Sequence, residues 1–117
     1  MQDQHKINYL EIPALDMQAT KDFFSAVFDW GFTDYGPEYS SFDNAGIDGG
    51  FYLADKVASV ASGSVLIVLY SEDLTSSAKK VLAHGGSIIR ETFSFPGGSR
   101  FHFSDPNGNE FAVWKKD

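Results

Sequence analysis

Apolar and polar residues alternate with a period of two on both sides of a dense turn near the end of the printed sequence. The turn reads Asp105-Pro106-Asn107-Gly108-Asn109, in which Pro106 restricts φ and Gly108 tolerates a positive φ. The alternation predicts two strands, near residues 100–104 and 111–115, that form a β-hairpin. One face of the hairpin carries Phe101, Phe103, Phe111 and Val113, and the other face carries His102, Ala112 and Trp114.

The rest of the pattern describes the same series of elements twice. Residues 7–12 read as a strand, residues 17–29 have helical spacing after the N-cap candidate Asp16, and Gly31 suits the end of that helix. Three short strands follow near 32–35, 39–44 and 51–54. The second series is a strand at 65–70, a helix after Asp73 that ends at Gly85-Gly86, and strands near 87–91, 100–104 and 111–115.

This order predicts an internal repeat of two βαβββ modules in a single α+β domain over 1–117. Module one covers about residues 6–54 and module two about residues 65–116. Residues 55–64 are small and polar, which is typical of a linker.

Composition and charge narrow the functional classes. The chain has 117 residues, of which 43% are hydrophobic and eleven are Phe, so it can bury a substantial core. Because there is no Cys, disulfides, thiolate nucleophiles and zinc sites with Cys ligands are excluded. The net charge of −7 argues against sequence-independent binding of nucleic acid. The polar start Met1–Lys6 is no signal peptide and no apolar run reaches membrane length, so we expect a cytoplasmic protein.

The repeat, with the segments LEIPALD, DFFSAVFDWGF and SDPNGNEFAVW, resembles the vicinal oxygen chelate superfamily. This family includes glyoxalase I, extradiol dioxygenases, fosfomycin-resistance enzymes and bleomycin-resistance proteins. The resemblance implies two βαβββ modules whose sheets curl into a U-shaped cup that holds a ligand, with the helices outside. It also implies a homodimer, which small members of the family usually form to complete their clefts.

Enzymes of that family typically hold a divalent metal with His or Glu on the first and last strand of each module. Aligned with this sequence, these places fall on Ile7, Leu66 and Ala112, and near residues 50–52. An apolar side chain cannot donate to a metal, so we interpret the family metal site as lost and expect no cofactor. His5 and His84 are expected at a frayed start and at a helix C-terminus, where they do not rebuild a site.

Strand alternation predicts which side chains face the cup. Leu10 and Ile12 should pack under the helix, which leaves Ile7, Tyr9 and Glu11 toward the cup. The predicted ligand-binding residues are aromatic or polar: Tyr9, Glu11, Tyr52, Tyr70, Arg100, His102 and Trp114, with Tyr39 and Ser41 as weaker candidates. An aromatic wall with a few polar groups is the usual composition of a small-molecule pocket.

Two of these residues are candidate catalytic groups. A partly desolvated Glu11 would serve as a general base, unless Arg100 or His102 pairs with it or it lies at a dimer interface. His102 or Arg100 would act as the electrophile of such an enzyme, or His102 would be a hydrogen-bonded structural histidine. Tyr70 and Trp114 would stack on a flat or cationic ligand, or would only fill the cup or a dimer interface. The Gly46–Gly50 segment lacks phosphate-loop spacing and reads as a turn.

The leading hypothesis is therefore a metal-independent small-molecule-binding protein of the glyoxalase/bleomycin-resistance type, dimeric, with an aromatic or amphipathic ligand. The alternative is a glyoxalase-like lyase or isomerase that uses Glu11 as base, with or without a metal. A third possibility is a protein-interaction module whose cup is filled by side chains.

Overall fold

The first half of the chain forms one four-stranded sheet with one helix. In the computed structural model, which describes residues 3–117, these elements are β1 (Tyr9–Ala14), α1 (Met17–Phe28), β2 (Gly31–Asp34), β3 (Tyr39–Asp43) and β4 (Asp48–Leu53). The strand order is β1-β4-β3-β2, with β1 parallel to β4 and the other neighbours antiparallel. Met1 and Gln2, which belong to the polar start of the sequence, lie outside the described residues.

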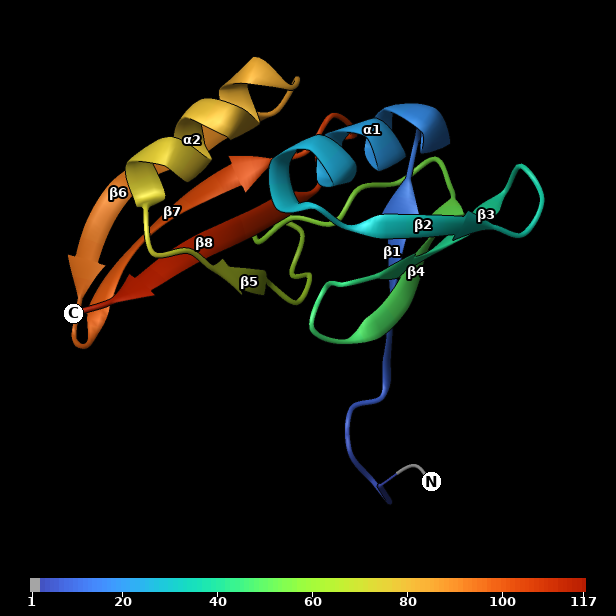
Figure 1. Ribbon diagram of the computed structural model, residues 1–117, viewed down its shortest axis with the longest axis horizontal. Helices are drawn as coiled ribbons and strands as arrows, with labels where there is room; N and C mark the ends of the chain where they lie inside the picture. Colours follow the sequence, from blue (N-terminus) through green and yellow to red (C-terminus); the bar gives the residue numbers. More distant parts are fainter. Residues whose placement is uncertain (1–2) are drawn as a thin grey trace.

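The second half repeats this arrangement. It contains β5 (Ile67–Tyr70), α2 (Leu74–Ala83), β6 (Ser87–Phe95), β7 (Gly98–Ser104) and β8 (Glu110–Lys116). The sheet order β5-β8-β7-β6 again has its first strand parallel to its last. Figure 1 shows α1 and α2 on the same side of the two sheets, and the chain before β1 running away from the body. The predicted repeat and the α+β fold class are confirmed.

Both helices begin where the sequence predicts. The Asp16 carboxylate accepts a hydrogen bond from the Ala19 amide at 3.0 Å, and Asp73 caps α2 in the same way. The end of α1 differs from the prediction, because Asp29 takes the left-handed conformation with φ of 61° and Gly31 already lies in β2. Asp tolerates this conformation better than most residues, so a glycine is not needed there.

The first strand of each module begins later than predicted. Ile7 and Val65 precede β1 and β5, and they are 80% and 85% exposed. β1 instead continues through Pro13, which lacks an N–H group. Since β1 is an edge strand of its sheet, Pro13 has one side without a partner strand, where the missing donor is tolerated.

The Asp48-Gly49-Gly50 segment is a strand and not the predicted turn. A Cβ atom on Gly49 would lie 2.4 Å from the Phe42 ring, and one on Gly50 would lie 2.4 Å from the Tyr39 hydroxyl. The two glycines therefore let an aromatic ring of β3 lie across each face of β4. β6 is also longer than predicted, since it continues to Phe95 through two register shifts.

One core joins the two sheets through α1. Phe24 packs on Phe51 of β4 and on Phe111 of β8, with ring centroids 5.3 and 5.2 Å apart. Phe23 of the same helix contacts Phe103 of β7. The predicted apolar face of the hairpin lies in this core, and its residues are at most 1% exposed: Phe101, Phe103, Phe111 and Val113.

The turn between β7 and β8 fastens the second module to the first. The Asp105 carboxylate accepts hydrogen bonds from the backbone amides of Asn107 and Asn109 at 3.0 and 2.9 Å, which fixes the turn. The Asn107 side chain then accepts from the backbone amides of Leu15 and Asp16, at the start of α1.

Asn109 makes the second part of this connection and is fully buried. Its side-chain amide donates to the Pro13 carbonyl at 2.6 Å and accepts from the Ala58 amide at 2.8 Å. The turn thereby holds β1 and the linker at once. Its polar residues, which are prominent in the sequence, have a structural role here.

No helix among the described residues combines the length and the apolar character needed to cross a membrane.

Candidate functional site

The predicted site residues fall into two groups, one on the outer face of each sheet. On β1, Leu10 and Ile12 face the core, whereas Tyr9 and Glu11 face away from it, as predicted. Ile7 is not in the strand and lies with Leu10 at an apolar cavity, away from the predicted position beside Glu11. Tyr52 of β4 lies beside Pro13 and is 40% exposed.

Tyr39 connects the first group. Its ring lies over Gly50, so that its hydroxyl reaches from β3 to β1. The hydroxyl donates to the Glu11 carboxylate at 2.9 Å and shares a hydrogen bond of 2.5 Å with the Tyr9 hydroxyl. Burial raises the pKa of Tyr39 far above its usual range, and the hydrogen bonds with Tyr9 and Glu11 raise it further. Tyr39 therefore remains a hydrogen-bond donor at any physiological pH.

This arrangement bears on the alternatives for Glu11. Among residues 3–117 the acid–base pairs are Lys21–Asp34 and His102–Glu110, so Glu11 does not pair with Arg100. Its carboxylate is exposed and is held by a phenol.

Aromatic side chains dominate the second group. Tyr70 and Trp114 are neighbours on β5 and β8, and their rings meet edge to face with centroids 5.1 Å apart. Phe95 of β6 lies on the other side of Trp114, at 6.3 Å. The Arg100 guanidinium lies 5.6 Å from the Phe95 ring, which is within range of a cation–π contact. These side chains pack against one another on the second sheet.

His102 is buried and belongs to a pair that the sequence did not reveal. Its Nδ1 atom lies 2.8 Å from the Glu110 carboxylate, whose other oxygen accepts from the Val60 amide at 3.0 Å. Burial raises the pKa of Glu110, but the hydrogen bonds from His102 and Val60 outweigh it and hold the pKa below the usual value. His102 is only 5% exposed, which fits the structural alternative for this residue.

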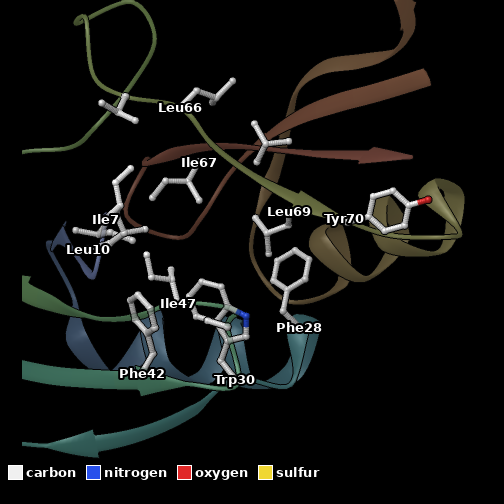
Figure 2. A pocket seen from close by; sticks show the side chains of 14 residues that line it. Ile7, Leu10, Phe28, Trp30, Phe42, Ile47, Leu66, Ile67, Leu69 and Tyr70 are labelled. Atoms are coloured by element: carbon white, nitrogen blue, oxygen red, sulfur yellow. The ribbon is translucent and has the colours of Figure 1, made fainter. Parts of the chain in front are cut away.

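The largest described cavity lies on the core-facing side of the first sheet, away from its outer face. It has a volume of about 610 Å³. Figure 2 shows its side chains, which come from the end of α1, from β3 and the β3–β4 turn, and from β1 and β5 with the residues just before them. The side chains that line it are apolar or aromatic: Ile7, Leu10, Ile12, Phe28, Trp30, Phe42, Ala45, Ile47, Val65, Leu66, Ile67, Val68, Leu69 and Tyr70.

A second cavity of about 460 Å³ lies next to the first and is more polar. Glu11 and Tyr52 line it together with Lys56 and Ser64 of the linker. The two cavities share Leu10, Ile12, Val65 and Ile67. They therefore meet between the edge strands β1 and β5.

Several residues of these cavities were not among the predicted site residues. Phe28 follows the helical pattern of residues 17–29, which indicates only a core, Trp30 comes just after that helix, and Lys56 lies in a segment that reads as a linker. Tyr39, a weaker candidate, holds Glu11. In the sequence, the Gly49-Gly50 pair was the feature that could have indicated this role of Tyr39, because a glycine leaves room for an aromatic ring to lie across the strand.

The places that would hold the family metal do not fit such an ion. Leu66 precedes Asp73 by seven residues, and in module one Tyr9 precedes Asp16 by the same number, so the corresponding place is Tyr9 and not Ile7. The last-strand places are Gly50, covered by Tyr39, and Ala112, fully buried opposite His102. Within residues 3–117 no three His, Asp or Glu side chains come together as a metal site. The absence of a cofactor stays a prediction.

Comparisons with known proteins place these features in context. A family model described as Glyoxalase/Bleomycin resistance protein/Dioxygenase superfamily matches residues 6–113. A comparison with curated proteins gave no match.

Solved structures share the fold at low sequence identity. A glyoxalase-related enzyme from Fulvimarina pelagi has a TM-score of 0.78 and 18% identity, over 96% of this chain and 88% of that one. A glyoxalase/bleomycin resistance protein/dioxygenase family enzyme from Burkholderia phytofirmans PsJN has a TM-score of 0.77 and 15% identity, over 94% and 98%. TnmS3, an antibiotic binding protein from Streptomyces sp. CB03234, has a TM-score of 0.70 and 19% identity over the whole of both chains.

Proposed function

The chain belongs to the glyoxalase/bleomycin resistance protein/dioxygenase superfamily, and from this premise we propose that it binds an apolar or aromatic small molecule without a metal. The observation that carries the proposal is the apolar cavity of about 610 Å³. Its volume lies within the range of about 300–1,000 Å³ that is typical of small-molecule sites, and its lining is mostly hydrophobic and aromatic, as such sites usually are. One solved structure of this fold is an antibiotic binding protein, which is consistent with a binding role.

The cavity differs from the predicted cup. It includes Tyr70 but lies on the core-facing side of sheet one, where Trp30 and Phe28 form its floor in Figure 2. Glu11 and Tyr52 belong to the adjoining polar cavity. The proposal therefore keeps a small-molecule ligand as the partner and moves its apolar part to the region between β1 and β5.

Calorimetric titration with phenylbutanol, an apolar body with one neutral polar end, tests this function. We expect saturable binding to the wild-type protein and none to Ala45→Phe, because the added ring occupies the cavity. Ala83→Phe is the matched control, since it adds the same ring at an exposed position of α2 outside the cavity. Binding that is absent from the wild-type protein, or unchanged in Ala45→Phe, would contradict the proposal.

A lyase or isomerase that uses Glu11 as base is the second candidate, and the hydrogen-bonded group Tyr9–Tyr39–Glu11 favours it. A base that removes a carbon-bound proton exchanges that proton with solvent, so a bound ligand incubated in heavy water should gain mass. Glu11→Gln should abolish the gain, whereas Glu38→Gln, which changes an exposed carboxylate in the turn before β3, should not. The absence of exchange in the wild-type protein would remove this candidate.

We also propose a homodimer and a cytoplasmic location. The dimer is supported by Ile7 and Val65, two large apolar side chains that are 80% and 85% exposed beside the cavity. Sedimentation equilibrium should give twice the mass of the chain, and Val65→Ser should shift it toward the monomer. Fractionation of cells that express the tagged protein tests the location.

A further inference from the structure

Two cavities of different chemistry lie next to each other between the edge strands β1 and β5. The larger is apolar, and the smaller contains an acidic and a basic side chain, Glu11 and Lys56. Leu10 and Ile67 are among the residues that line both, so the two spaces are adjacent, and a molecule that extends past these side chains would enter both. A ligand that fills both needs an apolar body and a polar end.

Glu11 is the better anchored of the two charged groups. It lies within strand β1, and the Tyr39 hydroxyl donates to its carboxylate at 2.9 Å, which orients the group. Only one lone-pair direction is used by that bond, so the carboxylate keeps acceptors for a ligand. Tyr52 stands on the neighbouring strand on the same face and lines the same cavity.

A carboxylate beside an aromatic face favours a cation. An aromatic ring such as that of Tyr52 attracts a cation over its face, and Glu11 carries a full negative charge. The Lys56 ammonium group lines the same cavity and would repel a cation, but it lies on the linker outside the strands, whereas Glu11 is fixed within β1. The chain as a whole carries a net charge of −7, which attracts cations from solution.

We propose that the ligand is a cationic amphiphile: a protonated amine whose ammonium group binds at Glu11 and Tyr52, and whose aromatic or branched apolar body fills the cavity behind Leu10 and Ile67. This inference rests on the proposed binding function and adds the chemical class of the ligand. The body supplies affinity through burial of apolar surface, and the head selects among molecules of the same body.

Three probes that differ only in their polar end test the inference: phenylbutylamine, phenylbutanol and phenylbutyrate. By calorimetry the wild-type protein should bind the amine about fivefold more tightly than the alcohol, the factor expected for a partly exposed ion pair. The acid should bind most weakly. The preference for the amine should shrink as the salt concentration rises, because salt screens exposed charges.

Two matched variants assign the preference to a residue. Glu11→Gln keeps the size of the side chain and should lower the affinity for the amine to about the affinity for the alcohol. Lys56→Gln should keep or increase the preference for the amine.

The outcomes separate this inference from the binding function. If the three probes bind equally and none binds to Ala45→Phe, the ligand has no preference for a cationic head, and the apolar cavity remains the binding site. Tightest binding of the acid, lost in Lys56→Gln, would overturn the inference in favour of an anionic ligand. Failure of every probe to bind the wild-type protein would remove both proposals.

Discussion

Replacing Asn109 by Ala should destabilise the protein more than its place in a turn indicates. The side chain is 0% exposed, and its amide bonds the Pro13 carbonyl at 2.6 Å and the Ala58 amide at 2.8 Å. The substitution leaves these two partly buried groups without this partner. A buried group costs about 1–3 kcal/mol when it is unpaired. Because both groups are only partly buried, we take about 1–2 kcal/mol for each and expect a loss of about 2–4 kcal/mol in the free energy of unfolding. That is a large part of the about 5–15 kcal/mol typical of a domain.

Urea unfolding followed by circular dichroism measures this loss. Gln18→Ala is the control, because Gln18 carries the same amide group and hydrogen-bonds Asp22 at 2.9 Å, but on the exposed side of α1. It should change the free energy of unfolding by less than about 0.5 kcal/mol. Hydrogen exchange adds a local readout, since the Ala58 amide should lose protection in Asn109→Ala. A loss below about 1 kcal/mol, or an unchanged Ala58 amide, would refute the view that this turn fastens the modules.

Three further substitutions test other parts of the structure. The low pKa of Glu110 means that its interaction with His102 stabilises the fold above the unfolded pKa, near 4.5, and that this stabilisation is lost as the pH falls through the folded pKa. Free energies of unfolding measured at several pH values should therefore fall less steeply toward acid pH in Glu110→Gln than in the wild-type protein. An equal fall in both proteins would contradict a stabilising role of the pair. Gly50→Ala places a Cβ 2.4 Å from the Tyr39 hydroxyl and should cost about 1–3 kcal/mol in urea unfolding. Phe24→Ala, at the contact between both sheets, should cost about 3–5 kcal/mol in the same assay, and a loss confined to one sheet would contradict a shared core.

The fold was predictable because its signals are local. The Asp16 and Asp73 caps, the period-two alternation of the hairpin and the order of elements each depend on neighbours within a few residues. Errors occurred where a distant partner decided the outcome. Gly49 and Gly50 read as a turn because the rings that cross them come from β3, and Pro13 read as a strand end because its position at a sheet edge is not visible locally.

The site was less predictable for the same reason. Strand alternation assigned Tyr9 and Glu11 to one face and Leu10 and Ile12 to the other, as the structure has them. It could not show the hydrogen bond between His102 and Glu110. That bond depends on the register of the hairpin and on the linker, whose Val60 amide donates to the same carboxylate.

Sequence pattern was sufficient for the repeat, the start of both helices and the alternation of faces along the strands. These follow from backbone periodicity and from side-chain chemistry, which each residue carries wherever it lies. Tertiary structure alone decided that the turn at residues 105–109 fastens two modules, that Tyr39 holds Glu11, and that an apolar cavity lies between β1 and β5. Cavities and buried hydrogen bonds arise from how separate elements pack, and packing depends on the distance between residues that are remote in the chain.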